Sequence, residues 1–368
     1  MRRGFLICAV VAAAIGATTA AAVAQPNERL VNVYNWSDYI DPKVIEDFTR
    51  ETGIKVRYDT FDSNEVLETK LLAGKSGYDV VVPTGYFLER QIKAGVFQKL
   101  DKSKLPNLVN VWPEIARGLA IYDPGNQYAV NYMWGTTGIG HNAAKAKEIV
   151  GAGTIIDSWD YVFKPENLAK FKDCGVYFLD SADDILSAAL KYLDLDPNTK
   201  DPKEIERAAE LVAKVRPYVR KFHSSEYLNA LATGEICFAV GWSGDIKQAH
   251  KRATEAKNGV EVRYVIPKEG AQMFFDNLAI PKDAPNVAEA HAFINYLLRP
   301  EVAARSSNFL GYANGNLASQ KFIDPAILND PTVYPDEQTM RKLYVITARD
   351  QKTQRLMNRL WTRIKTGR

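Results

Sequence analysis

The chain has few of the residues that enzymes use for metal binding or nucleophilic catalysis. Its 368 residues include three cysteines and four histidines, and the histidines lack H-E-x-x-H or any other metal-binding spacing. The dinucleotide-binding fingerprint, the P-loop and the G-x-S-x-G elbow are absent as well. These absences argue against an enzyme, and we expect no catalytic residue, no cofactor and no metal site.

The chain also lacks an excess of charge of one sign. Lys and Arg number 47, Asp and Glu number 44, and two of the basic residues lie at the extreme N-terminus. This balance is not typical of proteins that bind nucleic acid or an anionic membrane surface. Beyond the N-terminal segment, no run is long and apolar enough to cross a membrane. We therefore expect no nucleic-acid partner and no membrane span.

Residues 1–24 have the pattern of a secretory signal peptide. Two arginines precede an apolar run over residues 5–17, which is too short to span a bilayer, and three small residues follow that suit cleavage. We expect export, cleavage near Ala24 and a mature chain that begins at Gln25. The remaining length suits two domains of ordinary size.

Cleavage at that point would remove Cys8 and leave two cysteines, Cys174 and Cys237. In an oxidising compartment, two cysteines are most simply one disulfide. Both flank apolar runs, so a disulfide would join two neighbouring strands and close a loop of about 60 residues. Two buried free thiols are the alternative.

Strand-like and helix-like segments alternate along the first hundred residues of the mature chain. Strands are predicted over residues 30–34, 54–58 and 78–82, and helices over residues 42–52, 64–73 and 87–94. Asp41 suits the N-cap of the first helix, Pro42 its first position and Gly53 its end. This βαβαβ order predicts a mostly parallel sheet covered by helices.

A second unit of the same kind follows. Its strands are predicted over residues 137–140, 176–179 and 236–240, and its helices over residues 183–193, 202–215 and 225–232. After residue 259 the pattern resembles the first unit again, with strands predicted over residues 260–266 and 273–280 and a helix over residues 287–298 that Pro300 ends. Residues 336–366 are basic and mostly helical in pattern. We expect an α/β fold of two lobes joined by several strands. One lobe would comprise residues 25–134 and 260–312, and the other residues 135–259 and 313–368.

Four short segments each set a carboxylate beside an aromatic ring or a hydroxyl, and each lies at or near the end of a strand-like run. They are residues 36–39, 180–184, 242–245 and 274–276. In open α/β sheets, ligands bind beyond the carboxyl ends of the strands. A ring face attracts an ammonium group, and a carboxylate pairs with it directly. The four segments predict a cleft that binds a small organic cation.

These carboxylates also have interpretations that need no ligand. Asp183 and Asp184 lie at the start of a predicted helix, where the helix dipole stabilises negative charge. Asp38 has no helix to cap directly, which favours a ligand role. Asp276 lies within an apolar strand, where an unpaired charge is costly. It must therefore meet either an internal Lys or Arg or a cation in the cleft.

Longer stretches carry a resemblance that extends nearly from end to end. They are VYNWSDYI (33–40), FDSNEVLE (61–68), VVP (81–83), FLERQ (87–91), AGVFQKLDKSKLP (94–106), YMWGTTGIG (132–140), RYVIPKEGA (263–271) and YLLRP (296–300). In these segments the chain resembles the periplasmic polyamine-binding proteins of ABC importers, and most closely their putrescine-binding members.

The resemblance implies a periplasmic-binding-protein type II fold, in which two α/β lobes close on a ligand in the cleft between them. In that family, aromatic rings sandwich the methylene chain and carboxylates hold the ammonium ends. A disulfide between Cys174 and Cys237 is also implied. The implied ligand-binding residues are Trp36, Ser37, Asp38, Tyr39, Thr84, Tyr86, Asp184, Ser224, Trp242, Asp245, Phe274, Asp276 and Tyr312.

The same resemblance implies a periplasmic monomer whose partners are putrescine or spermidine and the inner-membrane permease subunits of an ABC importer. Putrescine ranks first, spermidine second, and cadaverine or agmatine behind them. A sensor that presents the polyamine to a receptor is one alternative. A polyamine-modifying enzyme is another, although it would need a cofactor motif or a catalytic base.

Three positions depart from the pattern of the putrescine binders. Asp184 stands where they carry a glutamate, and Tyr86 is bulky where they often have a small residue. Thr347 lies near the position at which they place a lysine that lines the site. Each of the three is a candidate determinant of the length of polyamine that the site accepts. Phe274, where some spermidine binders have tryptophan, favours putrescine.

Overall fold

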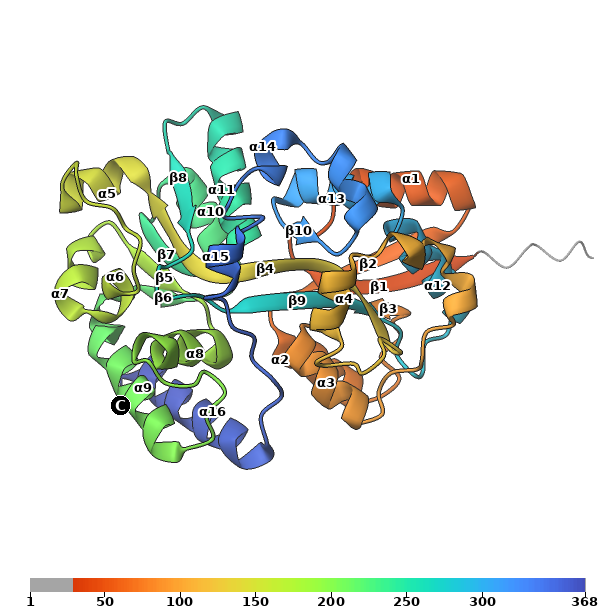
Figure 1. Ribbon diagram of the computed structural model, residues 1–368, viewed down its shortest axis with the longest axis horizontal. Helices are drawn as coiled ribbons and strands as arrows, with labels where there is room; N and C mark the ends of the chain where they lie inside the picture. The colour runs from red at the N-terminus through yellow and green to blue at the C-terminus, as the bar shows by residue number, and fades with distance from the viewer. Residues whose placement is uncertain (1–28, 368) are drawn as a thin grey trace, which may run out of the picture.

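Two lobes share one continuous β-sheet in the computed structural model, which describes residues 29–367 (Figure 1). Ten strands of the described chain form this sheet, in the order β2-β1-β3-β9-β4-β7-β5-β6, with β8 and β10 also paired to β4. The predicted α/β fold of two lobes is confirmed. The predicted signal peptide, with its cleavage site and Cys8, lies outside the described residues.

The first lobe contains the parallel strands predicted at the start of the chain, and it lies on the right of Figure 1. β1 pairs in parallel with β2 and with β3, whereas β9 runs antiparallel to β3. The Asp41 side chain accepts a hydrogen bond from the backbone N–H of Lys43, and Gly53 ends the first helix with a positive φ of 69°. The elements of this lobe are β1 (Leu30–Trp36), α1 (Pro42–Thr52), β2 (Lys55–Phe61), α2 (Asn64–Leu72), β3 (Val80–Val81), α3 (Gly85–Lys93), α4 (Pro113–Leu119), β9 (Met273–Ala279), α12 (Val287–Leu297), α13 (Pro300–Leu310), β10 (Ala313–Asn314) and α14 (Pro325–Leu328).

The second lobe has a smaller sheet with helices packed around it. β5 pairs in parallel with β6 and β7, while β4 runs antiparallel to β7 and β8. In Figure 1, α8, α9 and α16 lie below this sheet, and α10 and α11 lie above it. The elements of this lobe are α5 (Ala143–Val150), α6 (Asp160–Phe163), α7 (Pro165–Leu168), β5 (Val176–Phe178), α8 (Ala182–Tyr192), α9 (Pro202–Val215), β6 (Lys221–Phe222), α10 (Glu226–Thr233), β7 (Phe238–Trp242), α11 (Ser243–Ala256), β8 (Val262–Val265) and α16 (Gln351–Thr366).

The long strand β4 (Ala129–Asn142) runs from one lobe into the other (Figure 1). It pairs with β9 in the first lobe and with β7 and β8 in the second, and every residue of it is buried. Only residues 137–140 of this strand were predicted from the sequence. A Cβ on Gly138 would lie 2.4 Å from the carbonyl oxygen of Val265, so glycine there permits a close approach of two backbones.

The C-terminal segment crosses from the first lobe to the second, after the crossings made by β4 and by the link between β8 and β9. The short helix α15 (Glu337–Met340) is followed by non-helical residues 341–350, which lead to α16 in the second lobe (Figure 1). The backbone N–H of Met273 donates to the carbonyl oxygen of Tyr344 at 2.7 Å, and that of Ala348 donates to Glu89 at 2.8 Å. The predicted helical region is therefore interrupted where it passes over the junction of the lobes.

Two hydrophobic cores correspond to the two lobes. Val262 and Tyr264 belong to the core of the second lobe, whereas Val333 and Ile346 belong to that of the first. Sequence analysis placed these residues in the opposite lobes. We propose lobe boundaries that follow the two cores. The segment with Val262 and Tyr264 then belongs to the second lobe, and the segments with Val333 and Ile346 belong to the first.

The sequence patterns missed several helices of the described chain: α4, α5, α6, α7, α11, α13 and α14. α11 begins immediately after β7, at Ser243-Gly244, a pair of residues that does not favour helix. α13 begins at Pro300, which we predicted only as the end of the preceding helix; proline is equally suited to the first helical position. Within residues 29–367, we find no helix with the length and apolar character that a membrane span requires.

Candidate ligand-binding site

The candidate site lies where several strands end and helices begin. β1 ends at Trp36, and β7 ends at Trp242, which is also the N-cap residue of α11. Thr84 is the N-cap residue of α3, and Ser181 that of α8. Because the carboxyl ends of parallel strands meet at one edge of a sheet, these turns from both lobes converge on a single cleft.

One cavity between the lobes is lined by all thirteen predicted ligand-binding residues. It encloses about 570 Å³ of space free of atoms, part of which is open to solvent. Six lining residues were not predicted: Phe61, Asp62, Asn64, Ser225, Leu228 and Gln272. Three of them, Phe61, Asp62 and Asn64, lie from the end of β2 to the start of α2 and could have been recognised from this position at a strand end. Gln272 had no comparable signal.

Asp276 lies on the first-lobe side of the cavity and is 5% exposed. Its Oδ1 accepts a hydrogen bond from Thr84 Oγ1 at 2.6 Å, and its Oδ2 accepts one from the Tyr39 hydroxyl at 2.7 Å. Asn64 Nδ2 donates in turn to Thr84 Oγ1 at 3.0 Å, which orients that hydroxyl toward the carboxylate. Asp276 therefore meets neutral donors, and the alternative of an internal Lys or Arg does not apply.

Asp245 is held in the same manner from the second lobe, in the first turn of α11. Its Oδ1 accepts from the Tyr312 hydroxyl at 2.8 Å, and its Oδ2 accepts from the Tyr227 hydroxyl at 2.7 Å. Tyr312 belongs to the first-lobe core, so its bond to Asp245 spans the cleft. A Cβ on Gly244 would lie 2.0 Å from the Tyr312 ring, which explains the glycine at this close approach.

Asp184 lies in the first turn of α8 and completes the set of three buried carboxylates. Its Oδ1 accepts from Thr137 Oγ1 at 2.6 Å and, more weakly, from Trp242 Nε1 at 3.4 Å. Its Oδ2 accepts from Ser181 Oγ at 2.6 Å. All of these donors are neutral, so the charge of Asp184 is hydrogen-bonded without an ion pair among the described residues.

Burial makes the charged form of these three carboxyl groups costly. It raises the pKa of Asp276 to about 7 and that of Asp245 to about 6, against the hydrogen bonds from threonine and tyrosine hydroxyls, which lower them. Burial also raises the pKa of Asp184. A cation in the cavity would relieve this cost by pairing with the ionised groups.

Aromatic rings form the walls between these carboxylates. The Trp36 and Trp242 rings, from opposite lobes, meet edge to face with centroids 5.5 Å apart. Phe274 lies 6.4 Å from Trp242 and 6.2 Å from Tyr312, also in edge-to-face geometry. Trp36 Nε1 donates to the carbonyl oxygen of Val82 at 2.9 Å, which fixes its ring. Apolar walls between charged ends suit a ligand with a methylene chain and terminal cations.

Asp38 lines the cavity, but its carboxylate pairs across the cleft with a residue of the second lobe. Asp38 Oδ1 lies 2.6 Å from Arg252 Nη2, and its carbonyl oxygen accepts from Gln248 Nε2 at 3.2 Å. The side chains of the ion pair are 41% and 35% exposed. The backbone of Asp38 has a positive φ of 54°, which orients the turn after β1 toward α11. Asp38 is thus positioned to join the lobes.

Within the described chain, the remaining predicted residues form no hydrogen bond with the three buried carboxylates. Ser37 Oγ donates to the carbonyl oxygen of Phe61 at 3.3 Å, and Ser224 Oγ accepts from the backbone N–H of Asp180 at 3.1 Å. Tyr86 is buried against the cavity. Thr347 does not line the cavity; its backbone N–H donates to Asn198 Oδ1 at 2.9 Å. Of the three departures noted in the sequence, Asp184 and Tyr86 therefore contact the site directly.

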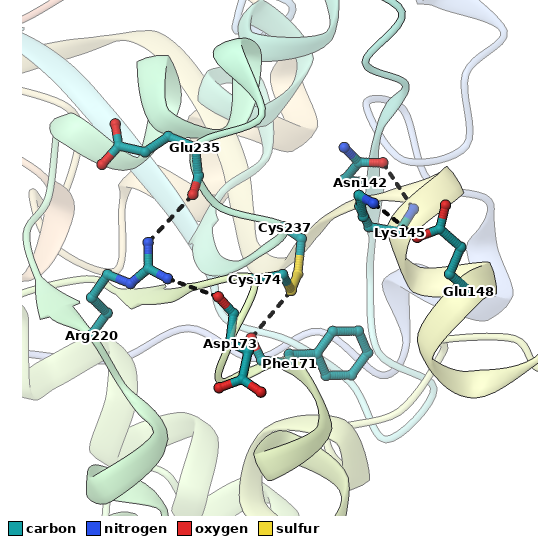
Figure 2. Close-up of a disulfide and its surroundings, with 9 residues drawn as sticks. All are labelled: Asn142, Lys145, Glu148, Phe171, Asp173, Cys174, Arg220, Glu235 and Cys237. Carbon is teal, nitrogen blue, oxygen red and sulfur yellow. Dashed lines mark hydrogen bonds and ion pairs between the residues drawn. A yellow bond between two sulfur atoms is a disulfide. The ribbon is translucent and has the colours of Figure 1, made fainter.

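The predicted disulfide joins Cys174 and Cys237, whose Cα atoms lie 5.6 Å apart, and it is confirmed (Figure 2). It connects the residues that precede β5 and β7, two neighbouring parallel strands of the second lobe. Arg220 donates to the carbonyl oxygens of Asp173 and Glu235, which lie one residue before Cys174 and two residues before Cys237 (Figure 2). The disulfide holds β5 and β7 together at the ends that lie away from the cavity.

Within residues 29–367, no group of three or more His, Cys, Asp or Glu side chains is arranged to hold a metal ion.

A family model described as bacterial extracellular solute-binding protein matches residues 43–335, and the chain belongs to this family. It is 57% identical over 342 residues to the putrescine-binding periplasmic protein SpuD of Pseudomonas aeruginosa (strain UCBPP-PA14), with 93% of each chain covered. It is 49% identical over 366 residues to the putrescine-binding periplasmic protein PotF of Escherichia coli K12, covering 99% of this chain and 97% of that protein.

A solved structure described as a putative spermidine/putrescine ABC transporter from Listeria monocytogenes superposes with a TM-score of 0.81 at 32% identity. The match covers 92% of this chain and all of that one. The resemblance stated from the sequence, to periplasmic polyamine-binding proteins and especially to putrescine binders, is thereby confirmed.

Proposed function

We propose that this protein binds a polyamine, putrescine first, in the periplasm and delivers it to an ABC importer. One observation carries the proposal: Asp184, Asp245 and Asp276 are buried around a single aromatic cavity, and all their hydrogen-bond donors are neutral. Buried carboxylates without an internal cation are costly, so a cationic ligand is the partner that balances them.

The ligand would be held at both ends and along its chain. Asp184 and Asp245 from the second lobe and Asp276 from the first pair with its ammonium groups. The rings of Trp36 and Trp242, with Phe274, Tyr39 and Tyr312, bury its methylene groups, each worth about 0.8 kcal/mol. Because Asp38 already pairs with Arg252, we assign the first-lobe anchor to Asp276.

A ligand that contacts both lobes binds the closed form better than an open one and shifts the population toward closure. The bond between Tyr312 and Asp245 and the ion pair between Asp38 and Arg252 would form in the same movement. The closed protein then presents both lobes together to the membrane permease. The names of the relatives support periplasmic binding, and that of the structural neighbour supports ABC transport.

The test is calorimetric titration of the mature protein, refolded after removal of any copurified amine, with putrescine, spermidine and cadaverine. We expect one-to-one binding of putrescine at micromolar concentration or below, and weaker binding of spermidine. Tighter binding of spermidine would assign the preference to the shorter Asp184 and the bulky Tyr86. Absence of binding to every amine would reject the proposal.

Two further measurements test the rest of the proposal. Mass spectrometry of the ligand after long incubation should recover it unchanged, since we propose binding without catalysis. Uptake of labelled putrescine by cells that lack the gene should be restored by the wild-type protein if it serves an importer. Normal uptake without the protein, but a lost transcriptional response to putrescine, would instead support a sensor.

A further inference from the structure

Gln272 has a buried polar atom that the site as described leaves unexplained. Its side chain lines the cavity and is 2% exposed. Among the described residues, no donor lies within hydrogen-bond distance of its buried Oε1. Buried polar atoms in folded proteins are nearly always hydrogen-bonded, so an unpaired amide oxygen on a residue that lines a ligand cavity indicates a partner supplied by the ligand.

Thr137 fixes the end of the cavity at which Gln272 lies. The backbone N–H of Thr137 donates to the carbonyl oxygen of Gln272 at 3.0 Å. The hydroxyl of the same residue donates to Asp184 Oδ1 at 2.6 Å. Gln272 and Asp184 therefore flank one residue of β4, and both line the same cavity.

A second unpartnered group lies on the neighbouring segment. Tyr344 pairs with Gln272 in an isolated parallel bridge, and its hydroxyl is buried without a partner among the described residues. Burial, and after it the negative charge of Asp184, raises the pKa of Tyr344, which indicates that this hydroxyl lies near the same carboxylate. Unpaired hydrogen-bonding groups thus lie on two bridged residues, Gln272 and Tyr344, the first of which lines the cavity.

The acceptors at this end can be counted. A carboxylate has about four acceptor positions, and Asp184 already uses three of them, for Thr137, Trp242 and Ser181. An ammonium group has three N–H donors, so Asp184 alone leaves two of them without an acceptor. The two lone pairs of Gln272 Oε1 are available for one of these donors.

We propose that Gln272 is a ligand-binding and specificity-determining residue, whose Oε1 accepts an N–H of the polyamine nitrogen held by Asp184. This inference rests on the proposed function and adds to it a recognition element for an N–H donor. A site that uses an amide acceptor here favours a primary ammonium group over a quaternary or fully alkylated one, which has no N–H to donate.

The test compares three variants. Gln272→Met keeps the side-chain length and removes the amide, whereas Gln272→Glu keeps the shape and retains acceptor oxygens. Gln91→Met is the matched control, because Gln91 is fully buried in α3, both of its amide atoms lack partners among the described residues, and it does not line the cavity. Each protein is titrated calorimetrically with putrescine and with N,N,N,N′,N′,N′-hexamethylputrescine, and its thermal stability without ligand is recorded.

We expect Gln272→Met to weaken putrescine binding about tenfold or more, as for loss of a hydrogen bond to a charged group. Its thermal stability without ligand should be unchanged or higher, as for Gln91→Met, because an unpaired polar group has been replaced by an apolar one. Gln272→Glu should bind putrescine within about threefold of the wild type or more tightly. The hexamethyl compound should bind wild type and Gln272→Met equally weakly.

Putrescine binding by Gln272→Met within about twofold of the wild type would overturn the inference. Equal losses in Gln272→Met and Gln272→Glu would also overturn it, since they would indicate packing and not hydrogen bonding. A wild type that binds no polyamine would reject the proposed function itself, so the two failures are distinguishable.

Discussion

Asp183 and Asp184 are neighbours in the first turn of α8 and are both buried, yet they have opposite surroundings. Asp183 Oδ1 lies 3.0 Å from Arg349 Nε, in an ion pair whose side chains are 3% and 4% exposed. Arg349 also donates to Ser187 and to the carbonyl oxygen of Pro197. Asp184, one residue later, has neutral donors and lines the ligand cavity.

The difference distinguishes a buried carboxylate with an internal counter-charge from one without. Arg349 compensates Asp183 and fixes the crossing segment of residues 341–350 to the second lobe. Asp184 has hydrogen bonds to orient it but no ion pair among the described residues, and the same is true of Asp245 and Asp276. A buried carboxylate that has only neutral donors is a candidate for binding an external cation.

The largest effect on binding is expected for Asp245→Ala. A ligand ammonium would lose its partner in a buried site, which costs several kcal/mol, so putrescine affinity should fall about a hundredfold or more. The ligand-free protein should lose at most about 1–3 kcal/mol of stability, because the buried Tyr227 and Tyr312 hydroxyls lose their acceptor while the cost of the buried charge is removed. Calorimetric titration and denaturant unfolding measure the two quantities, and an affinity within tenfold of the wild type would remove Asp245 from the site.

Asp183→Asn should produce the opposite pattern. It leaves Arg349 buried without its counter-charge, so the free energy of unfolding should decrease by about 3 kcal/mol or more. Urea unfolding of the ligand-free protein measures this loss. Putrescine affinity of the folded variant should stay within a few-fold of the wild type. If Asp183→Asn were as stable as the wild type but failed to bind, the contrast between the two residues would be wrong.

The pH dependence of stability should distinguish Asp276 from a compensated carboxylate. Its pKa of about 7 in the folded protein is above the ordinary value of 3.8, so the folded state binds the proton more tightly than the unfolded state. Ionisation of Asp276 therefore costs stability as pH rises from about 4 to about 7. The melting temperature of Asp276→Asn relative to the wild type, measured without ligand, should increase by several degrees across that range. A constant difference would contradict the raised pKa.

The smallest effect is expected for Arg252→Ala at the mouth of the cleft. Its ion pair with Asp38 is partly exposed, and such pairs contribute about 1 kcal/mol or less. Putrescine affinity should fall only a few-fold, and the loss should shrink at high salt because the pair is screened. Asp38→Ala should match it. A hundredfold loss in Asp38→Ala alone would mean that Asp38 itself holds the ligand.

Sequence patterns predicted the first lobe best, because its elements are local. Caps such as Asp41 and Gly53 define a helix within a dozen residues, and alternating apolar positions define its neighbouring strands. The length of the long strand β4 was underestimated because residues 129–136 pair with β9, which is distant in sequence. The lobe assignment of Val333 and Ile346 likewise depends on packing that no local pattern records.

The candidate site was predictable where a residue type and a strand end coincide. Trp36, Trp242 and Asp245 could be recognised in this way, and the resemblance to a family added Tyr312 and Thr84. The partners of these residues were not predictable, since Asp38 could have faced a ligand and instead pairs with Arg252, more than two hundred residues away. Gln272 had neither a charge nor a ring to single it out.

Proton release on putrescine binding tests most directly whether the buried carboxylates are the ligand's partners. At pH 6.5, Asp276 and part of the Asp245 population should carry a proton in the free protein, because their pKa values are about 7 and about 6. Titrations in two buffers of different ionisation enthalpy measure the number of protons released. Release on binding, reduced in Asp276→Asn, is the predicted result. Tight binding of putrescine without proton release, and with equal affinity in Asp276→Asn, would contradict the assignment of these carboxylates as its partners.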